Sequence, residues 1–319
     1  MAALTRAIAV KPGDGFEHWH QVTCRDFSTT ECRRVPDRGF RAEVAIRPFG
    51  PLMLNDIWSA TPAETPIEVT RTPADIRKDP RDYFMLWLPL AGEASFAQGG
   101  REAHMMAGDL MLHDQAQPFA LAFGARAHAI MVSIPRALMI ARLSAAPRLT
   151  ARRIPRGSKL AALAGTLVQR MADLDDDTAD EVVARLGASA LDIVTATLDA
   201  ALAGERPAAH DRRLTQVQAY MRARLGEPAL DLDAIARAQN MAPRTLYRLF
   251  AADGTTPMRW LWQQRLAASF TALNEGRVTQ VTDAAFSFGF SDLSHFSRAF
   301  KAAFGASPHA VLRRASPPD

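Results

Sequence analysis

Hydrophobic and polar positions change their spacing along this chain of 319 residues. Between residues 40 and 46 apolar side chains alternate with others, which is the period of a strand with one buried face. The run "YFMLWLPL" at 83–90 is apolar throughout, as in a strand covered on both faces. The next segment contains further short strands about a Gly99-Gly100 turn. The pattern predicts a β-sandwich or small barrel over about 33–135.

The spacing becomes helical after this region, where alternation gives way to Ala and Leu. Helices are predicted over 135–143, 158–173 and 178–203, and another near the start over 15–27. Two of them carry apolar stripes at helical spacing, made of Leu160, Leu163, Leu167 and Met171, and of Val182, Leu186, Ile193 and Leu198. We expect the helices of 158–203 to form a homodimer contact or to couple the strand-rich region to the rest of the chain.

The C-terminal part of the chain repeats one pattern. "LDLDAIARAQNMAPRTLYRLF" at 230–250 and "QVTDAAFSFGFSDLSHFSRAF" at 280–300 each consist of a helix, a short turn and a second helix ending in Arg-x-Phe. Two helices joined by such a turn form a helix-turn-helix unit. The pattern predicts two units, over about 231–252 and 280–303, joined by a stiff helix over 257–274.

Local chemistry agrees with these helix boundaries. Asp231 and Ser291 are predicted N-caps, because their side-chain oxygens can accept free backbone N–H groups. Gly289 supplies a turn conformation that a side chain would resist. Phenylalanines are concentrated between residues 284 and 305, and we expect them to form the core of a small helical subdomain, opposite its cations.

The exposed faces of the second helix in each unit carry side chains suited to DNA. Arginine pairs bidentately with guanine, and serine or histidine can reach base edges in the major groove. Lys301 lies toward a helix C-terminus, where a phosphate contact is expected. The predicted DNA-contacting residues are Arg244, Thr245, Tyr247, Arg248, Ser294, His295, Ser297, Arg298 and Lys301.

Charge and composition are consistent with this hypothesis. The net charge is +4, and the positive excess lies after residue 210, as in a module that binds a polyanion such as double-stranded DNA. The N-terminus lacks the apolar stretch of a signal peptide. The longest apolar run, 83–92, is shorter than the roughly 20 residues that cross a membrane. We therefore expect a cytoplasmic protein without a membrane association.

The C-terminal motifs resemble those of the AraC/XylS family of bacterial transcription regulators. "GFSDLSHFSRAFKAAFGASPHAVLR" is similar to the family's C-terminal signature, and "IARAQNMAPRTLYRLF" to its first helix-turn-helix. "TTPMRWLWQQRLAASFTALNEG" resembles its connecting helix. Ala242 departs from a common capping serine, so the first recognition helix is expected to be less firmly set. His295 replaces a frequent tyrosine.

The N-terminal half resembles the effector domain of the XylS-like branch through "FEHWHQVTCRDF", "GEASFAQGGREAHMMAGDLMLHDQAQPFAL" and "IPRALM". The resemblance implies an α+β chain: a cupin-like β-barrel with following helices over 1–205, then an all-α DNA-binding domain over 211–319. It also implies an activator that works with RNA polymerase and answers to a small effector, aromatic in many relatives. The candidate effector-binding residues are Trp58, Met85, Trp87 and His113.

Two alternatives remain open at this point, and a third is excluded. Cys24 and Cys32 permit a thiol-based redox sensor, although two cysteines do not make a disulfide framework. A barrel of this type can hold a metal in an enzyme, but the histidines lack the expected clustering. A DNA-repair methyl acceptor needs more zinc-held thiolates than two cysteines provide. We expect no catalytic residues, no metal and no cofactor, hence a regulator that is not an enzyme.

Overall fold

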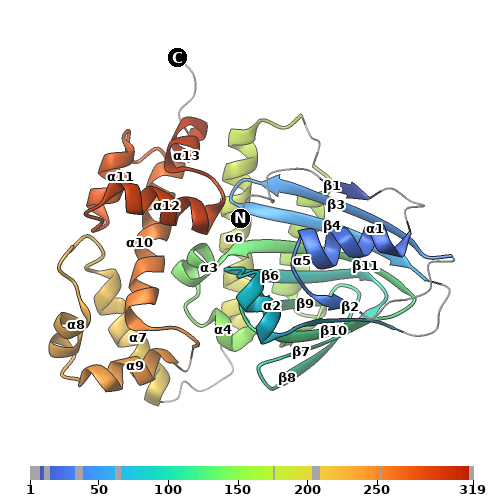
Figure 1. Cartoon of the computed structure of the whole chain (residues 1–319), viewed down its shortest axis with the longest axis horizontal. Helices are drawn as coiled ribbons and strands as arrows, with labels where there is room; N and C mark the ends of the chain where they lie inside the picture. Colours follow the sequence, from blue (N-terminus) through green and yellow to red (C-terminus); the bar gives the residue numbers. More distant parts are fainter. Residues whose placement is uncertain are drawn as a thin grey trace. The chain divides into compact units, whose positions relative to one another are not determined.

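The computed structural model describes residues 8–10, 15–32, 39–61, 66–174, 177–202, 209–251 and 253–315. The chain forms two compact units (Figure 1). The first comprises Met1–Pro135 and Leu149–Ala201, and the second comprises Arg136–Arg148 and Leu202–Asp319. Most of the linker expected at 203–211 lies outside the described residues. The boundaries 1–205 and 211–319 stay predictions.

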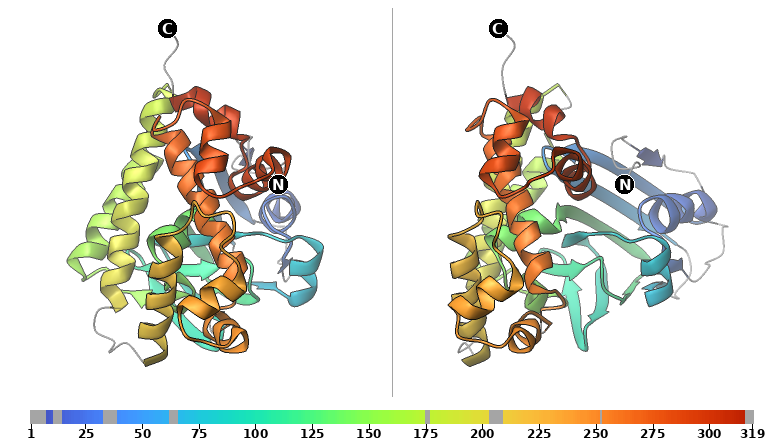
Figure 2. Two further views of the ribbon diagram at one scale, coloured as in Figure 1. Left: turned by 90° about the vertical axis from the view of Figure 1, so that its left-hand side faces the viewer. Right: turned by 60° about the vertical axis from the view of Figure 1, so that its left-hand side comes forward.

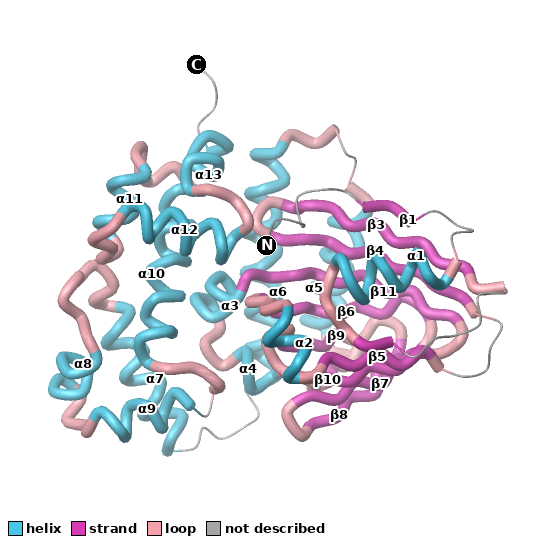
Figure 3. Tube along the Cα trace, viewed as in Figure 1, coloured by secondary structure: helices cyan, strands magenta, loops and turns pink. Residues whose placement is uncertain are grey.

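Two antiparallel sheets form the first unit (Figure 3). The seven-stranded sheet contains, in spatial order, β1 (Ile8–Val10), β3 (Arg41–Phe49), β4 (Leu52–Ala60), β11 (Arg126–Pro135), β6 (Tyr83–Ala91), β9 (Leu110–Asp114) and β12 (Arg153–Ile154). The five-stranded sheet contains β2 (Glu31–Cys32), β5 (Ile67–Arg71), β10 (Phe119–Phe123), β7 (Glu93–Gln98) and β8 (Arg101–Met106). The sheet-rich fold expected for this part of the chain is confirmed.

The strands follow the hydrophobic pattern closely. Along β3, every second side chain from Ala42 to Ile46 is buried, because one face of this strand packs on the core. Most of β6 is buried on both faces, as its continuous apolar sequence indicates. Gly99 and Gly100 have φ angles of 58° and 73° and form the turn between β7 and β8. These conformations are accessible to glycine at no steric cost.

The helices of the first unit leave part of their predicted apolar stripes exposed. They are α1 (Phe16–Gln21) with the π-helical segment η1 (Val22–Asp26), α2 (Pro73–Lys78), α5 (Lys159–Ala172) and α6 (Asp180–Leu202). The predicted stripe on α5 is divided: Leu160 and Leu163 are 45% and 56% exposed, while Met171 is buried together with Ala161 and Ala164. Small side chains permit close packing, and Gly165 lies against Leu88 of β6.

A similar difference occurs on α6. Val182 and Leu186 are 45% and 41% exposed, whereas Leu198 is buried. At the far end of α5, Arg47 of β3 donates hydrogen bonds to the carbonyl oxygens of Met171 and Leu174. The guanidinium thus satisfies carbonyls that have no partner inside the helix. Both helices thus have large apolar side chains on their solvent side, namely Leu160 and Leu163 on α5 and Val182 and Leu186 on α6.

The described part of the second unit is helical. Its elements are α3 (Arg136–Arg142), α4 (Ala146–Leu149, at the edge of the unit), α7 (Ala209–Arg222), α8 (Leu232–Ala238), α9 (Pro243–Ala251), α10 (Pro257–Asn274), α11 (Val281–Ser287), α12 (Leu293–Phe304) and α13 (Pro308–Ala315). Figure 2 shows α10, in orange, running lengthwise through this unit. The bounds of α10 match the predicted connecting helix, and the two expected helix pairs are α8–α9 and α11–α12.

Aromatic side chains form much of the core of the second unit. Phe290, Phe296, Phe300 and Phe304 are buried and stack on one another and on α10. This confirms the expected role of the phenylalanines, with one correction: Phe286 is 52% exposed. None of the helices in the described ranges combines the length and the apolar character that a bilayer crossing demands.

Candidate functional site

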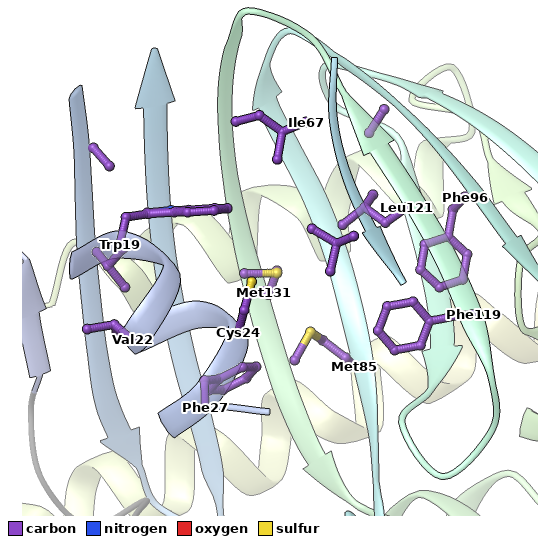
Figure 4. Close-up of a cluster of buried hydrophobic side chains, with 14 of the residues drawn as sticks. Trp19, Val22, Cys24, Phe27, Ile67, Met85, Phe96, Phe119, Leu121 and Met131 are labelled. Carbon is purple, nitrogen blue, oxygen red and sulfur yellow. The ribbon is translucent and has the colours of Figure 1, made fainter. Parts of the chain in front are cut away.

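The first unit contains a cavity of about 110 Å³ between its N-terminal helical segment and its strands. Figure 4 shows the cluster around it: Trp19 and Cys24 come from the helical segment, Phe27 directly follows it, and Met85 and Met131 come from β6 and β11. Its further apolar lining residues include Ile57, Val69, Trp87, Phe119, Leu121 and Phe123. The walls are therefore mainly aromatic and thioether groups, which suit a small apolar ligand.

A chain of hydrogen bonds crosses one wall of this cavity. Trp87 donates from Nε1 to Nδ1 of His113 at 2.7 Å, so the ring proton of His113 resides on Nε2. That nitrogen lies 2.7 Å from Oε1 of Gln115 and donates to it. Gln115 in turn donates to Oγ of Ser28 at 2.6 Å. Burial lowers the pKa of His113 to about 4, which keeps the ring neutral near pH 7.

A buried arginine lies behind this wall and donates four hydrogen bonds to neighbouring groups. Arg71 donates to the hydroxyl of Ser28 and to the backbone oxygens of Gln115, Thr29 and Asp79. Its Nη1 is also 3.9 Å from the carboxylate of Asp79. Because the neighbouring groups occupy its donors and balance its charge, Arg71 stabilises the wall and does not present a cation to the cavity.

Three of the four predicted effector-binding residues line the cavity. They are Met85, Trp87 and His113, from β6 and β9. Trp58 is absent from the lining. It lies on the other face of β4 and borders a separate depression with Asp56 and His128. The structure thus brings three of the candidates together and places the fourth elsewhere.

Several lining residues were not predicted from the sequence, above all Trp19, Cys24 and Gln115. Helical spacing around Trp19 predicts a helix but does not reveal which sheet that helix covers. Gln115 follows directly after β9, and its polarity next to a buried strand was an available signal. The cavity depends on contacts between segments distant in sequence, so periodicity could not identify its complete lining.

The two cysteines are close to each other and unoxidised. Cys24 is buried and lines the cavity, and Cys32 is half-buried. A hydrogen bond from the Cys32 thiol is the main influence that lowers the pKa of Cys24, to about 7. Within the described ranges, no group of three or more His, Cys, Asp and Glu side chains is arranged to hold a metal ion.

In the second unit, α9 and α12 present the predicted DNA-contacting side chains. Arg244, Tyr247 and Arg248 are exposed on α9, while Leu246 and Phe250 are buried on its inner face. On α12, Ser294, His295, Arg298 and Lys301 are exposed. Thr245 and Ser297 are half-buried.

The cations of these two helices remain available to a ligand. Among the residues that the structure describes, no carboxylate forms an ion pair with Arg244, Arg248, Arg298 or Lys301. His295 is less free, because its ring lies 5.0 Å from that of Trp262. The surface therefore carries charges suited to phosphates and side chains suited to base edges.

Side-chain caps fix the first residues of α8 and α12. The carboxylate of Asp231 accepts a backbone N–H at 2.8 Å at the start of α8, which confirms that cap. The predicted cap at Ser291 was wrong, because Asp292 caps α12 and accepts from the His295 backbone at 2.8 Å. The same hydrogen bond lowers the pKa of Asp292. An exposed aspartate competes well with serine for this position.

Comparison with known proteins covers both units. An AraC-binding-like domain matches residues 19–199, and a helix-turn-helix domain matches residues 235–314. The transcriptional activator NphR of a Rhodococcus species is 32% identical over 310 residues, which span 95% of this chain and 90% of that protein. The XylDLEGF operon transcriptional activator of Pseudomonas putida is 33% identical over 88 residues, 27% of each chain.

A solved structure shows the same fold over most of the chain. The crystal structure of the AraC-like transcriptional activator CuxR superposes with a TM-score of 0.56 at 18% identity, covering 84% of this chain and 96% of that one. The relatives are named as transcriptional activators, which gives no support to the redox-sensing alternative. The matched domains and the near-complete alignment show that this chain belongs to the AraC/XylS family of transcription regulators.

Proposed function

We propose that this protein activates transcription by binding promoter DNA through α9 and α12 under the control of an effector in the cavity. The observation that carries the proposal is the set of exposed cations on these two helix faces, for which the described residues provide no ion pair. Two such helices joined by α10 fit successive major grooves, about 34 Å apart on one face of a duplex. The proposed contact residues are Arg244, Thr245, Tyr247, Arg248, Ser294, His295, Ser297, Arg298 and Lys301.

Selection from a random duplex pool with the full-length chain tests DNA recognition. We expect one asymmetric sequence to be enriched, with affinity that falls steeply as salt rises, because bound cations displace counterions from the phosphates. The variant Arg298→Ala should weaken binding, whereas Arg170→Ala, an exposed arginine of α5 paired with Asp173, should not. Failure to enrich any sequence would refute the proposal.

We also propose that the protein is a homodimer through α5 and α6. Leu160, Leu163, Val182 and Leu186 expose 41–56% of their surface on the solvent side of these two helices. Leu160 lies beside Thr197 near the end of α6, far along the helix from Val182, so the exposed side chains form two apolar sites on one helix pair, which favours a protein contact. Light scattering should show a dimer that Leu163→Glu weakens. A monomer at tens of micromolar, with and without DNA, would contradict the dimer.

As an activator, the protein is proposed to act in the cytoplasm with RNA polymerase and to catalyse no reaction. The names of its relatives support activation. Transcription in vitro with purified polymerase and the selected DNA site should rise when an effector is added. A fall in transcript on addition of the protein would instead identify a repressor.

A further inference from the structure

The cavity of the first unit holds a thiol and reaches the protein surface at one end. Two of its lining residues, Glu93 and His128, are exposed and half-buried, so a small molecule can enter there from solvent. Cys24 is the lining residue that carries the thiol, and its side chain is buried. Figure 4 shows its sulfur directed from the helical segment into the cluster of buried side chains. A reagent therefore meets this sulfur by way of the cavity.

The surroundings of Cys24 favour its ionised form. The hydrogen bond from the Cys32 thiol lowers the pKa of Cys24 to about 7, although burial by itself would raise that pKa. The buried hydroxyl of Thr30 acts in the same direction and finds no other hydrogen-bond partner among the described residues, and the nearby guanidinium of Arg25 adds a favourable charge. Hydrogen bonding to Cys24 raises the pKa of Cys32. Near pH 7.5 the pair thus holds one thiolate, on Cys24, and the thiolate is the nucleophilic form.

A thiolate in this wall selects against anions. It repels a carboxylate, and so does Glu93 at the open end. The histidines of the lining do not compensate, because His113 is neutral with a pKa of about 4 and His128 is hydrogen-bonded to Asp56 at 2.7 Å. A buried carboxylate without a cation pays a large desolvation penalty.

An uncharged electrophile, in contrast, removes the charge from the cavity. Bond formation at the Cys24 sulfur replaces a buried thiolate by a thioether. Met85 and Met131 already contribute thioethers to the same lining, so this group suits the apolar walls. Burying an apolar group is favourable, whereas burying a charge is costly.

We infer that Cys24 captures a small, uncharged α,β-unsaturated aldehyde or ketone, and that the adduct is the effector-bound state. The inference rests on the proposed function, in which occupation of this cavity controls DNA binding. The sulfur forms a bond to the β-carbon while the carbon–carbon π bond breaks. The electron pair moves to the α-carbon, which takes up the proton that the thiol released. The reaction consumes no oxidant, unlike disulfide formation between Cys24 and Cys32.

Peptide mass mapping of the full-length protein treated with methyl vinyl ketone at pH 7.5 tests the site. Cys24 should be modified at least about tenfold faster than Cys32, because Cys24 is mostly thiolate at this pH and Cys32 stays protonated. This order is opposite to that of exposure, since Cys24 is buried and Cys32 is half-buried. The two rates come from one molecule, so the comparison requires no variant. Faster modification of Cys32, or no adduct on Cys24, would overturn the inference.

A pair of reagents of similar size tests the selection against charge. Iodoacetamide is uncharged and iodoacetate is an anion, and each transfers its carbon to sulfur with release of iodide. Iodoacetamide should modify Cys24 at least about tenfold faster than iodoacetate, because the carboxylate must be buried beside a thiolate. Equal rates with the two reagents would contradict a cavity that excludes anions.

Cysteine variants separate the nucleophile from the residue that positions it. Cys24→Ser should abolish the adduct. Cys32→Ala should keep the reaction but slow it about tenfold at pH 7.5 and move the midpoint of its pH dependence above 7, since the hydrogen bond that favours the thiolate is lost. Thermal unfolding verifies that both variants are folded. An unchanged midpoint in Cys32→Ala would remove Cys32 from the site.

DNA binding connects the adduct to regulation. Methyl vinyl ketone should change the affinity for the selected DNA site at least about fivefold, and the change should survive dialysis because the bond is covalent. Butan-2-one, which has the same size but no electrophilic double bond, should leave no lasting change, and Cys24→Ser should give no lasting response. An adduct on Cys24 with unaltered DNA affinity would overturn its assignment as the effector-bound state. Sequence-selective DNA binding by the untreated protein would still leave the proposed regulator standing.

Discussion

The two helix-turn-helix units have the same order of helices, but the side-chain cap is on the first helix in one unit and on the second helix in the other. In the first, Asp231 caps α8, while α9 follows Ala242, whose methyl group cannot accept a hydrogen bond. In the second, Gln280 makes no side-chain cap at α11, while Asp292 caps α12. The second recognition helix therefore has the better-defined N-terminus, which is the end that enters the major groove in proteins of this type.

The turns of the two helix-turn-helix units also differ, and the second turn is again the more firmly held. Asn240 has a φ of 50° and Gly289 a φ of 77°, so both adopt the left-handed conformation. A Cβ on Gly289 would lie 2.7 Å from the carbonyl oxygen of Leu225 and 2.9 Å from the guanidinium of Arg265. Arg265 itself donates to the carbonyl oxygens of Leu225 and Glu227. Tertiary contacts thus hold the second turn, which teaches that similar local sequences can be fixed to different degrees.

The largest expected effect on stability comes from adding a side-chain carbon at Gly289, in the turn of the second helix-turn-helix. Gly289→Ala should lower the free energy of unfolding by about 3 kcal/mol, because it adds a backbone clash to an unfavourable φ. Asn240→Ala in the first helix-turn-helix should cost only about 1 kcal/mol. Denaturant unfolding of the full chain measures both. Gly305→Ala, at φ 75° with open space around it, separates the two causes and should also cost about 1 kcal/mol. A loss for Gly289→Ala no larger than for Gly305→Ala would break the comparison.

Base readout should differ between the two helix-turn-helix units. Arg298→Ala should remove a guanine preference in one half of the DNA site, at about 1–3 kcal/mol if the arginine is bidentate. Arg244→Ala should have a smaller effect, because the N-terminus of α9 lacks a side-chain cap. Binding to a library of single-base variants measures both. A uniform loss on every sequence with Arg298→Ala would reduce that residue to a phosphate contact.

Lys301 separates phosphate contact from base readout on the same helix. Lys301→Ala should weaken binding to all sequences alike and reduce the slope of log affinity against log salt by about one unit. Titrations at several salt concentrations provide the slope. A change of preference at a single base position would show instead that Lys301 reads sequence.

Adding a side-chain cap at the start of α9, in the first helix-turn-helix, should reduce the difference in stability between the two recognition helices. Ala242→Ser should stabilise the protein by about 1 kcal/mol, because the hydroxyl can accept an unpaired N–H at the start of α9. Ala302→Ser, at an exposed position inside α12, should give no such gain. Thermal unfolding compares the two. An equal response would show that α9 does not need a cap.

The smallest expected effect is a pH dependence of local stability at the start of α12, in the second helix-turn-helix. The backbone N–H of His295 lowers the pKa of Asp292 below its usual 3.8. This contribution is fully present above pH 3.8 and is lost as the pH falls through the lower folded value. Amide hydrogen exchange at the start of α12 should therefore accelerate below pH 4 relative to α9. Asp292→Asn keeps a capping oxygen that does not titrate, so a persistent difference in that variant would exclude the carboxylate as its cause.

Local patterns were sufficient for the second unit. The spacing of apolar residues, the left-handed glycine and the cations of α9 and α12 are all encoded within short segments, so helices and their exposed faces were predictable. The error at Ser291 is a shift of one residue. It arose because Ser291 and Asp292 are both good caps, and only the path of the chain into α12 selects between them.

The first unit shows what the sequence alone determined and what it left to the tertiary structure. Alternation identified the strands, because a strand with one buried face needs an apolar residue at every second position. It did not decide that Ala161 and Ala164 face the sheet while Leu160 and Leu163 face solvent, because both sets have helical spacing. The cavity and the placement of Trp19 in its wall arise from contacts between distant segments, and such contacts leave no periodic signal in the chain.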